Sequence, residues 1–272
     1  AEDADDQGRK ITGKAALDAQ NWDAPVVVTT NVQLFESLFA ARPARCRKLH
    51  AIPQSVIVLD EAQVLPVAYL KPCMAVLREL TRHYGASAVL CTATQPALDK
   101  SDWLPDGLEG VQEIAPDPDG LHARFRRVDV REIGPRDDAT LADDLAAREQ
   151  VLCIVDSRAH AAALVQAVKA RAGAGEACFH LSARMCPAHR RETLATIKAR
   201  LDVDFPAVFR ALAGLDSLAQ AAGRCNRERR AERGTLHVFR SDRESRLPDW
   251  RRRITCARAV LDSGADPLSP AA

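Results

Sequence analysis

One short stretch, residues 56–63, limits what this chain can fold into more than any other. It begins with four branched apolar residues and continues into the adjacent carboxylates Asp60 and Glu61 and the amide of Gln63. A short run of branched apolar residues is typical of a strand buried on both faces of a central parallel sheet. Ligands bind beyond the carboxyl ends of such strands, so one carboxylate can hold Mg²⁺ while its neighbour polarises a water molecule. The alternative is an acidic turn that caps the next helix.

The rest of the chain alternates between apolar runs and amphipathic stretches, which predicts strands joined by helices. Strands are expected at residues 26–30, 56–59, 88–91, 128–130, 151–155, 177–181, 207–212 and 235–240. Helices are expected after residue 30, from residue 63 to Gly85, at 140–149, 158–171 and 187–200, and from a cap at Asp216 or Ser217. This order predicts an α/β protein of two stacked lobes with parallel sheets, joined by the Pro-, Gly- and Asp-rich residues 99–120.

The composition of the chain argues against several classes of protein. Aromatic residues make up only 4%, so base stacking is not expected to be the main mode of nucleic-acid binding. Net charge is +1, but arginine is in excess between residues 224 and 258, which indicates a polyanionic partner for the C-terminal part. No apolar run is long enough to span a membrane, and the acidic N-terminus is unlike a signal peptide. Eight cysteines without a Cys-x-x-Cys pair favour a reduced, cytoplasmic setting.

Two other patterns imitate ligand sites. Residues 8–14 have the G-x-x-x-x-G-K spacing of a phosphate loop, but Ala15 stands where a hydroxyl would ligate Mg²⁺ and no buried strand precedes the loop. We expect a solvated turn leading into a helix there. Zinc-ligand residue types occur at Cys178, His180, Cys186 and His189. A strand and the start of a helix at Pro187 account for that second pattern without a metal.

Three short motifs follow one another along the chain, on predicted strand ends and a predicted helix. They are Asp-Glu-Ala-Gln at 60–63, Thr-Ala-Thr at 92–94 and Gln-Ala-Ala-Gly-Arg-Cys-Asn-Arg at 220–227. Together they resemble the second, third and sixth motifs of superfamily 2 helicases. The more specific stretches 28–38, 46–50, 153–160 and 180–190 closely resemble the helicase-nuclease of type I CRISPR systems.

This resemblance covers about residues 20–240. It implies two RecA-like lobes with parallel sheets, the first truncated at its N-terminus. The implied parts are a partial first lobe at 21–120 and a partial second lobe at 121–262. From their composition, residues 1–20 are expected to be a polar leader and residues 263–272 a disordered tail.

The resemblance also implies roles for residues of the first lobe. Asp60 would be the Mg²⁺ ligand, and Glu61 would orient the water that attacks ATP. Gln63, Thr92 and Thr94 would couple the state of the nucleotide to movement between the lobes. ATP and Mg²⁺ are therefore the implied cofactors.

The sixth motif would act from the second lobe. Gln220, Arg224 and Arg227 would reach across the interlobe cleft, where an arginine neutralises charge on the transferred phosphoryl group. A solvated basic helix face is the alternative for these arginines. The residues expected on the phosphates of single-stranded DNA are Thr29, Thr30, Asn31 and Ser182. Taken alone, the two threonines are equally well explained as a helix cap.

The chain also departs from this family. The phosphate loop and the N-terminal metal nuclease domain have no counterpart, and the fifth helicase motif is mostly absent because residues 198–201 run directly into Asp-Val-Asp-Phe-Pro at 202–206. Since the phosphate loop holds the β and γ phosphates, we expect that this chain alone does not hydrolyse ATP.

The resemblance implies a function in antiviral CRISPR interference. The family function is ATP-dependent translocation along single-stranded DNA, with an RNA-guided surveillance complex as partner and no membrane involved. Two alternatives stay open for this chain: a non-catalytic nucleic-acid-binding or docking module, and one half of a split helicase whose phosphate loop comes from a second polypeptide. A general RNA helicase is the alternative within the enzymes, although the stretches at 31–38 and 185–190 argue against it.

Overall fold

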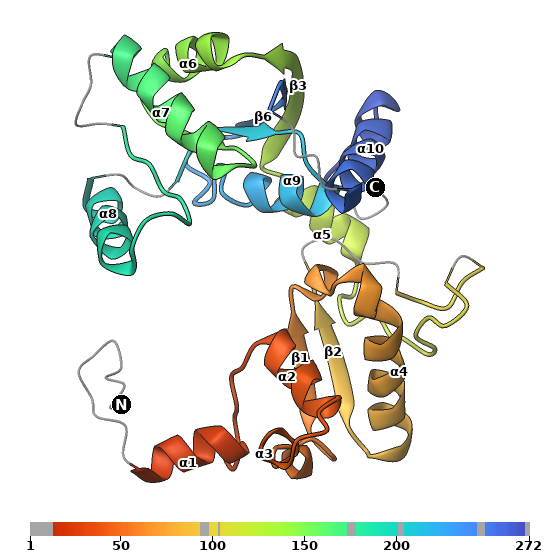
Figure 1. The fold of residues 1–272 in the computed structure, drawn as a ribbon. Helices are drawn as coiled ribbons and strands as arrows, with labels where there is room; N and C mark the ends of the chain where they lie inside the picture. The colour runs from red at the N-terminus through yellow and green to blue at the C-terminus, as the bar shows by residue number, and fades with distance from the viewer. Residues whose placement is uncertain are drawn as a thin grey trace. The chain divides into compact units, whose positions relative to one another are not determined.

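The computed structural model describes residues 13–92, 98–102, 104–172, 178–200, 204–243 and 248–269. The chain divides into two compact units, residues 1–114 and residues 115–272; Figure 1 shows their helices and strands, most of them labelled. In both units the paired strands run parallel. The predicted α/β class with parallel sheets is confirmed. No helix within the described ranges has the length and apolar character needed to cross a membrane.

The first unit is built on the parallel pair β1 (Val56–Asp60) and β2 (Ser87–Cys91), which α4 (Val67–His83) connects. Its other helices are α1 (Gly13–Asn21), α2 (Asn31–Leu38), α3 (Pro43–Cys46) and the short 3-10 helices η1 (Leu49–Ala51) and η2 (Ala62–Val64). Helix α4 buries residues at helical spacing, including Met74 and Leu77, and Gly85 turns the chain into β2 with a φ of +64°. The β-α-β unit predicted from residue 56 onward is therefore confirmed.

The prediction of a strand at residues 26–30 is wrong. These residues form no strand, and Val26 and Val28 are exposed. Thr30 instead caps α2, since its hydroxyl accepts a hydrogen bond from the main-chain N–H of Gln33 at 3.1 Å. A strand needs a neighbouring ladder as well as β-branched residues, and no described strand pairs with this segment.

Strand β1 forms where it is predicted, but it is not buried on both faces. Ile57 and Leu59 point into the core, whereas Val56 and Val58 are 69% and 58% exposed. Within the described residues the sheet has only two strands, and no element covers the face that bears Val56 and Val58. We call this surface the bare face of β1.

The second unit contains a four-stranded parallel sheet in the order β3-β6-β5-β4. Its strands are β3 (Val128–Arg136), β4 (Val151–Ile154), β5 (Ala207–Ala211) and β6 (Gly234–Ser241). Helices α6 (Asp138–Ala146) and α7 (Arg158–Ala172) share a core cluster with Phe209 and Phe239. Helices α9 (Leu215–Ala222) and α10 (Pro248–Asp262) share another with Val208 and Leu236, so helices cover both faces of this sheet. The remaining helices are α5 (Pro118–Phe125) and α8 (Pro187–Arg200).

Three predictions for the second unit need correction. Residues 178–181 form no strand, although β4 is an edge strand of the described sheet. Gly214, rather than Asp216 or Ser217, is the N-cap of α9. Residues 263–269 were predicted to be part of a disordered tail, but they form turns, and Leu268 packs against the core that α9 and α10 share. Residues 270–272 lie outside the described part of the chain.

Helix α10 was not predicted at all. Its residues Trp250, Ile254, Ala257 and Leu261 pack against the core of the second unit. Their spacing is that of one face of a helix. The four arginines in residues 251–258 drew attention to the charge of the stretch instead of its apolar periodicity.

Candidate functional site

The carboxyl ends of β1 and β2 bring polar side chains together at one edge of the sheet. Asp60 pairs in register with Cys91, so Thr92 follows β2 at the edge where Glu61 follows β1. The Gln63 amide joins the two strand ends: its Oε1 accepts a hydrogen bond from Thr92 Oγ1 at 2.6 Å, and its Nε2 donates one to the Glu61 carboxylate. The parallel register is what allows two motifs 29 residues apart to meet through one side chain.

The acidic pair sits in a tight turn. Glu61 adopts φ 54° and ψ 46°, the left-handed region, which costs a non-glycine residue about 1–2 kcal/mol. Its N–H donates to Asp60 Oδ1 at 3.0 Å, and both carboxylates are exposed. An exposed carboxylate with only one oxygen engaged by the chain's described residues suits a hard cation such as Mg²⁺.

The segment before α2 lies beside this pair. Asn31 Nδ2 donates to the main-chain oxygen of Asp60 at 3.4 Å, which ties the start of α2 to the end of β1. Thr29 donates its hydroxyl hydrogen bond to Gln33 Oε1, whereas the Thr30 hydroxyl is engaged as the helix cap. For Thr30 the structure therefore shows the capping arrangement that the sequence left open as the alternative.

The residues of the sixth motif lie on α9 and the turn after it. Gln220 is exposed on α9, and Arg224 and Arg227 are exposed in the turn. Between the two arginines, Cys225 and Asn226 are buried. These two residues anchor the turn in the core, while the arginines on either side of them face solvent. Burial, reinforced by the nearby Asp204 carboxylate, raises the pKa of Cys225 to about 11, so its thiol stays neutral.

Two buried polar residues hold this turn, and sequence reasoning assigned neither of them a role. The Asp204 carboxylate is 6% exposed and accepts hydrogen bonds from the main-chain N–H groups of Arg227 and Glu228, at 2.5 and 3.2 Å. Asn226 adopts a φ of 46°, donates to the Ala231 oxygen at 2.8 Å and accepts from the Ala231 N–H at 3.1 Å. The signals in the sequence were the acid before Phe-Pro and an asparagine at a turn.

The other predicted site residues are dispersed. Ser182 lies in the turn before α8, and its Oγ accepts a hydrogen bond from the Arg184 N–H at 3.4 Å. Thr94 and most of residues 8–14 lie outside the described part of the chain. No group of three or more potential metal ligands occurs in the ranges that the structure describes.

Comparison with solved structures identifies the class of fold as that of RecA-like helicase lobes. The T. fusca Cas3 structure with ATP matches with a TM-score of 0.60 and 19% identity, over 89% of this chain and 37% of that one. The T. fusca Cas3 structure with AMPPNP matches with a TM-score of 0.59 and 20% identity, over 86% of this chain and 34% of that one.

Sequence comparison identifies the particular relative. Eighty-four residues are 36% identical to the CRISPR-associated nuclease/helicase Cas3 of Haloferax volcanii. The match covers 31% of this chain and 9% of that protein, and no family model matches the chain. The predicted resemblance is confirmed: in sequence and fold the chain is similar to part of Cas3, and it spans only a fraction of its relatives' length.

Proposed function

We propose that the chain is part of an ATP-driven motor that moves along single-stranded DNA, and that the 272-residue chain alone binds DNA without hydrolysing ATP. The observation that carries this proposal is the Gln63 bridge between Glu61 and Thr92. A motor must convert a change at the γ-phosphate into movement of another element. The bridge offers such a route, because a movement of Glu61 toward an attacking water would be transmitted through the two hydrogen bonds of Gln63 to Thr92, which follows the neighbouring strand.

Nucleotide chemistry is proposed for the acidic pair and the sixth motif. Asp60 would hold Mg²⁺, which neutralises phosphate charge when it is bound, and Glu61 would orient the attacking water. Gln220, Arg224 and Arg227 would supply positive charge and a hydrogen-bonding amide from the second unit. The proposal is supported by the exposure of these three side chains and by the likeness to T. fusca Cas3, whose matching structures contain ATP and AMPPNP.

The DNA would be held by hydroxyl and amide groups on its phosphates, with little sequence preference. Thr29, Asn31 and Ser182 are the proposed contacts, with Thr30 orienting α2 through its cap. Thr94 belongs to the proposed coupling motif with Thr92. By analogy with the relatives we propose a cytoplasmic role in CRISPR interference, with an RNA-guided surveillance complex as partner and a phosphate loop that a second polypeptide could supply.

The arginine-rich surface of the second unit favours one other candidate function. Arg229, Arg251, Arg252 and Arg258 are exposed in addition to the arginines of the sixth motif. A surface of this kind suits a module that binds nucleic acid or docks on it without catalysis. In that case adding a polypeptide that carries a phosphate loop would produce no ATP hydrolysis that Glu61→Gln abolishes, which separates the two candidates.

The test combines a DNA-binding titration with an ATPase assay on the purified chain. We expect binding to fluorescent oligothymidine that weakens steeply with salt, and no Mg²⁺-dependent ATP hydrolysis with or without that DNA. The absence of DNA binding at low salt would overturn the motor proposal. DNA-stimulated hydrolysis that Glu61→Gln abolishes would contradict the claim that the chain is inactive alone.

A further inference from the structure

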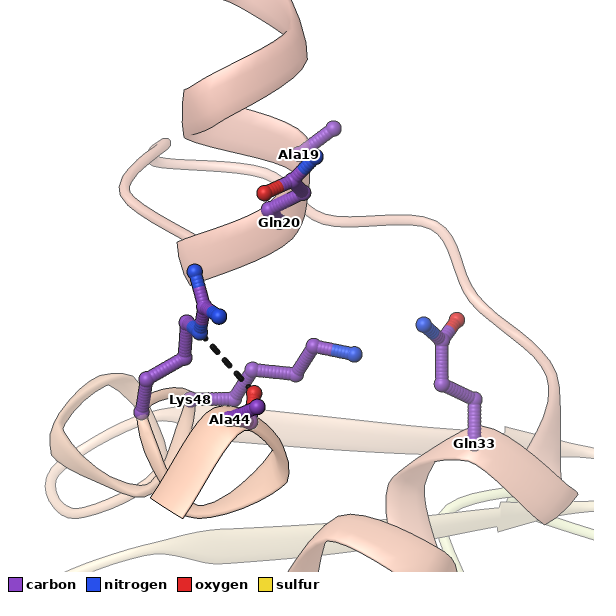
Figure 2. Close-up of a pocket in the computed structure, with 6 residues that line it drawn as sticks. Ala19, Gln20, Gln33, Ala44 and Lys48 are labelled. Carbon is purple, nitrogen blue, oxygen red and sulfur yellow. Dashed lines mark hydrogen bonds between the residues drawn. The ribbon is translucent and has the colours of Figure 1, made fainter.

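A basic pocket lies between α1, α2 and the segment that follows α3 (Figure 2). Its volume is about 300 Å³, and its lining residues are Ala19, Gln20, Gln33, Ala44, Arg47 and Lys48. No carboxylate is among these residues, so the two cations give the lining a net positive charge. We call it the basic pocket. None of the motif residues that were assigned a role lines it.

Both cations of the basic pocket are held in place while their charge stays available. Lys48 places its Nζ 5.2 Å from the centre of the Trp22 ring, and Trp22 is buried in the core of the first unit. Arg47 donates from Nε to the Ala44 oxygen at 2.9 Å, which leaves its two terminal NH₂ groups for a ligand. Among the ion pairs between described residues, none involves Arg47 or Lys48, whereas the nearby Arg45 pairs with Glu36 at 3.0 Å.

The basic pocket adjoins the segment proposed to contact DNA. Gln33 lines the pocket and accepts the hydrogen bond from Thr29 through Oε1, while its Nε2 has no hydrogen-bond acceptor among the described residues. Figure 2 shows the Lys48 side chain extending toward Gln33. An ammonium group, a guanidinium group and amide donors around one cavity form the donor set that binds phosphate oxygens.

We propose that the basic pocket binds a backbone phosphate of single-stranded DNA through Arg47 and Lys48, with Gln33 joining this phosphate to the one at Thr29. The proposal rests on the proposed function, because it extends the path of the same strand along the first unit. It adds two positively charged phosphate contacts to a segment that otherwise offers only neutral hydroxyl and amide groups.

The experiment measures binding of fluorescein-labelled oligothymidine by the whole chain over a series of NaCl concentrations. The variants are Arg47→Gln, Lys48→Gln, the double variant, and Arg45→Gln as the matched control from the same basic stretch. We expect each single pocket variant to weaken binding about 3- to 10-fold and to reduce the salt slope by about 0.7 for each lost cation. Arg45→Gln should stay within about twofold of the wild type, since its charge is already paired with Glu36.

A loss of fold must be separated from a loss of contact, because Lys48 also touches Trp22. Lys48→Arg keeps the charge and should restore both affinity and salt slope, and an unchanged thermal unfolding midpoint should show that the core is intact. If the wild type binds DNA and the double variant binds equally well with the same slope, the basic pocket proposal is overturned and the proposed function survives. If the wild type does not bind, both fall.

A further arm separates a DNA phosphate from free phosphate. We expect inorganic phosphate, compared with chloride at equal ionic strength, to leave oligothymidine binding unchanged at millimolar concentration. Suppose that phosphate causes a saturable change in tryptophan fluorescence that Lys48→Gln abolishes, while the double variant keeps full DNA affinity. The pocket is then a site for free phosphate, and the DNA claim is wrong.

Discussion

The two sheets of this chain differ in how completely other elements cover their faces. The four-stranded sheet of the second unit carries helices on both faces, and Phe209, Phe239, Val208 and Leu236 are fully buried between the layers. Within the described residues, the two-stranded sheet of the first unit is covered on the side of Leu59, whereas Val56 and Val58 on the other face of β1 are exposed. Parallel sheets are normally covered on both faces, so the first unit is the exception.

The difference bears on function because Asp60 has the same parity along β1 as Val56 and Val58, and thus lies on the bare face. The acidic pair, the Gln63 bridge and the basic pocket all belong to the less covered unit. The second unit presents its motif residues on a turn anchored in a complete core by Asp204 and Asn226. We therefore expect mutations in the second unit to act mainly through stability, and those on the bare face of the first unit to leave stability nearly unchanged.

The largest expected effect is in the second unit, at the buried ion pair between Arg210 and Asp156. Their side chains are each 6% exposed, and Arg210 NH1 lies 2.6 Å from Asp156 Oδ1. Arg210→Met should destabilise the unit by about 3–5 kcal/mol, because it leaves a buried carboxylate without its partner. Urea unfolding followed by circular dichroism measures this, and adding Asp156→Leu should recover most of the loss. A cost below about 1 kcal/mol for Arg210→Met would show that the second unit is less closely packed than described.

The next effect contrasts the two faces of β1 directly. Leu59→Ala removes a side chain that is 1% exposed and should cost about 2–4 kcal/mol. Val58→Ala, one residue away on the bare face, should change the free energy of unfolding by less than about 0.5 kcal/mol. Thermal unfolding of both variants gives the comparison. Equal costs would mean that something covers Val58 in solution.

A smaller effect is expected at the anchor of the sixth-motif turn. Asp204→Ala leaves the N–H groups of Arg227 and Glu228 without their acceptor and should cost about 1–3 kcal/mol. The exposed arginines of this turn are trypsin sites, so limited proteolysis should cut the variant faster than the wild type at residues 227–230. Unchanged cleavage would show that Asp204 does not hold the turn.

The smallest effect is a pH dependence confined to the second unit. His237 stacks on Phe209 with ring centres 4.5 Å apart, and burial, with Arg148 and then Arg131 nearby, lowers its pKa, against an opposing effect of Asp144. Since its pKa is lower in the folded state than in the unfolded one, His237 favours folding fully only above its unfolded pKa, and that contribution is lost as pH falls through the folded value.

The second unit should therefore be less stable near pH 5 than near pH 7, and His237→Gln should flatten that part of the pH profile. Unfolding free energies measured across this range provide the check. An unchanged profile in the variant would assign the pH dependence to other groups.

The parts of the fold that the sequence predicted well are those set by local pattern. Residues 187–200 form α8 with the predicted ends, and α4 with Gly85 and β2 follow the predicted order, because helical periodicity and a left-handed glycine are readable in a single segment. Residues 26–30 and 178–181 have strand-like composition but form no strand. Pairing depends on a neighbour that local composition does not reveal.

The candidate site was predictable to a similar extent. The motif residues Glu61, Gln63 and Thr92 were named from the sequence, and the structure shows the hydrogen bonds that join them; their roles stay predictions. Asp204 was not assigned a role, because its hydrogen bonds reach main-chain groups far along the sequence, and Asn226 was not, because its bonds to Ala231 depend on the conformation of the turn. The pocket role of Arg47 and Lys48 likewise depends on the placement of α1 beside α2, which no motif encodes.

The central proposal is that the acidic pair and residues 29–31 belong to a motor, and that these 272 residues alone do not bind nucleotide. The most direct measurement is a titration of the purified chain with a fluorescent ATP analogue and Mg²⁺, with and without oligothymidine. The account predicts no saturable nucleotide binding at micromolar concentration, while oligothymidine binds with or without nucleotide. Saturable nucleotide binding that Lys14→Ala weakens would make residues 8–14 a working phosphate loop and contradict the claim.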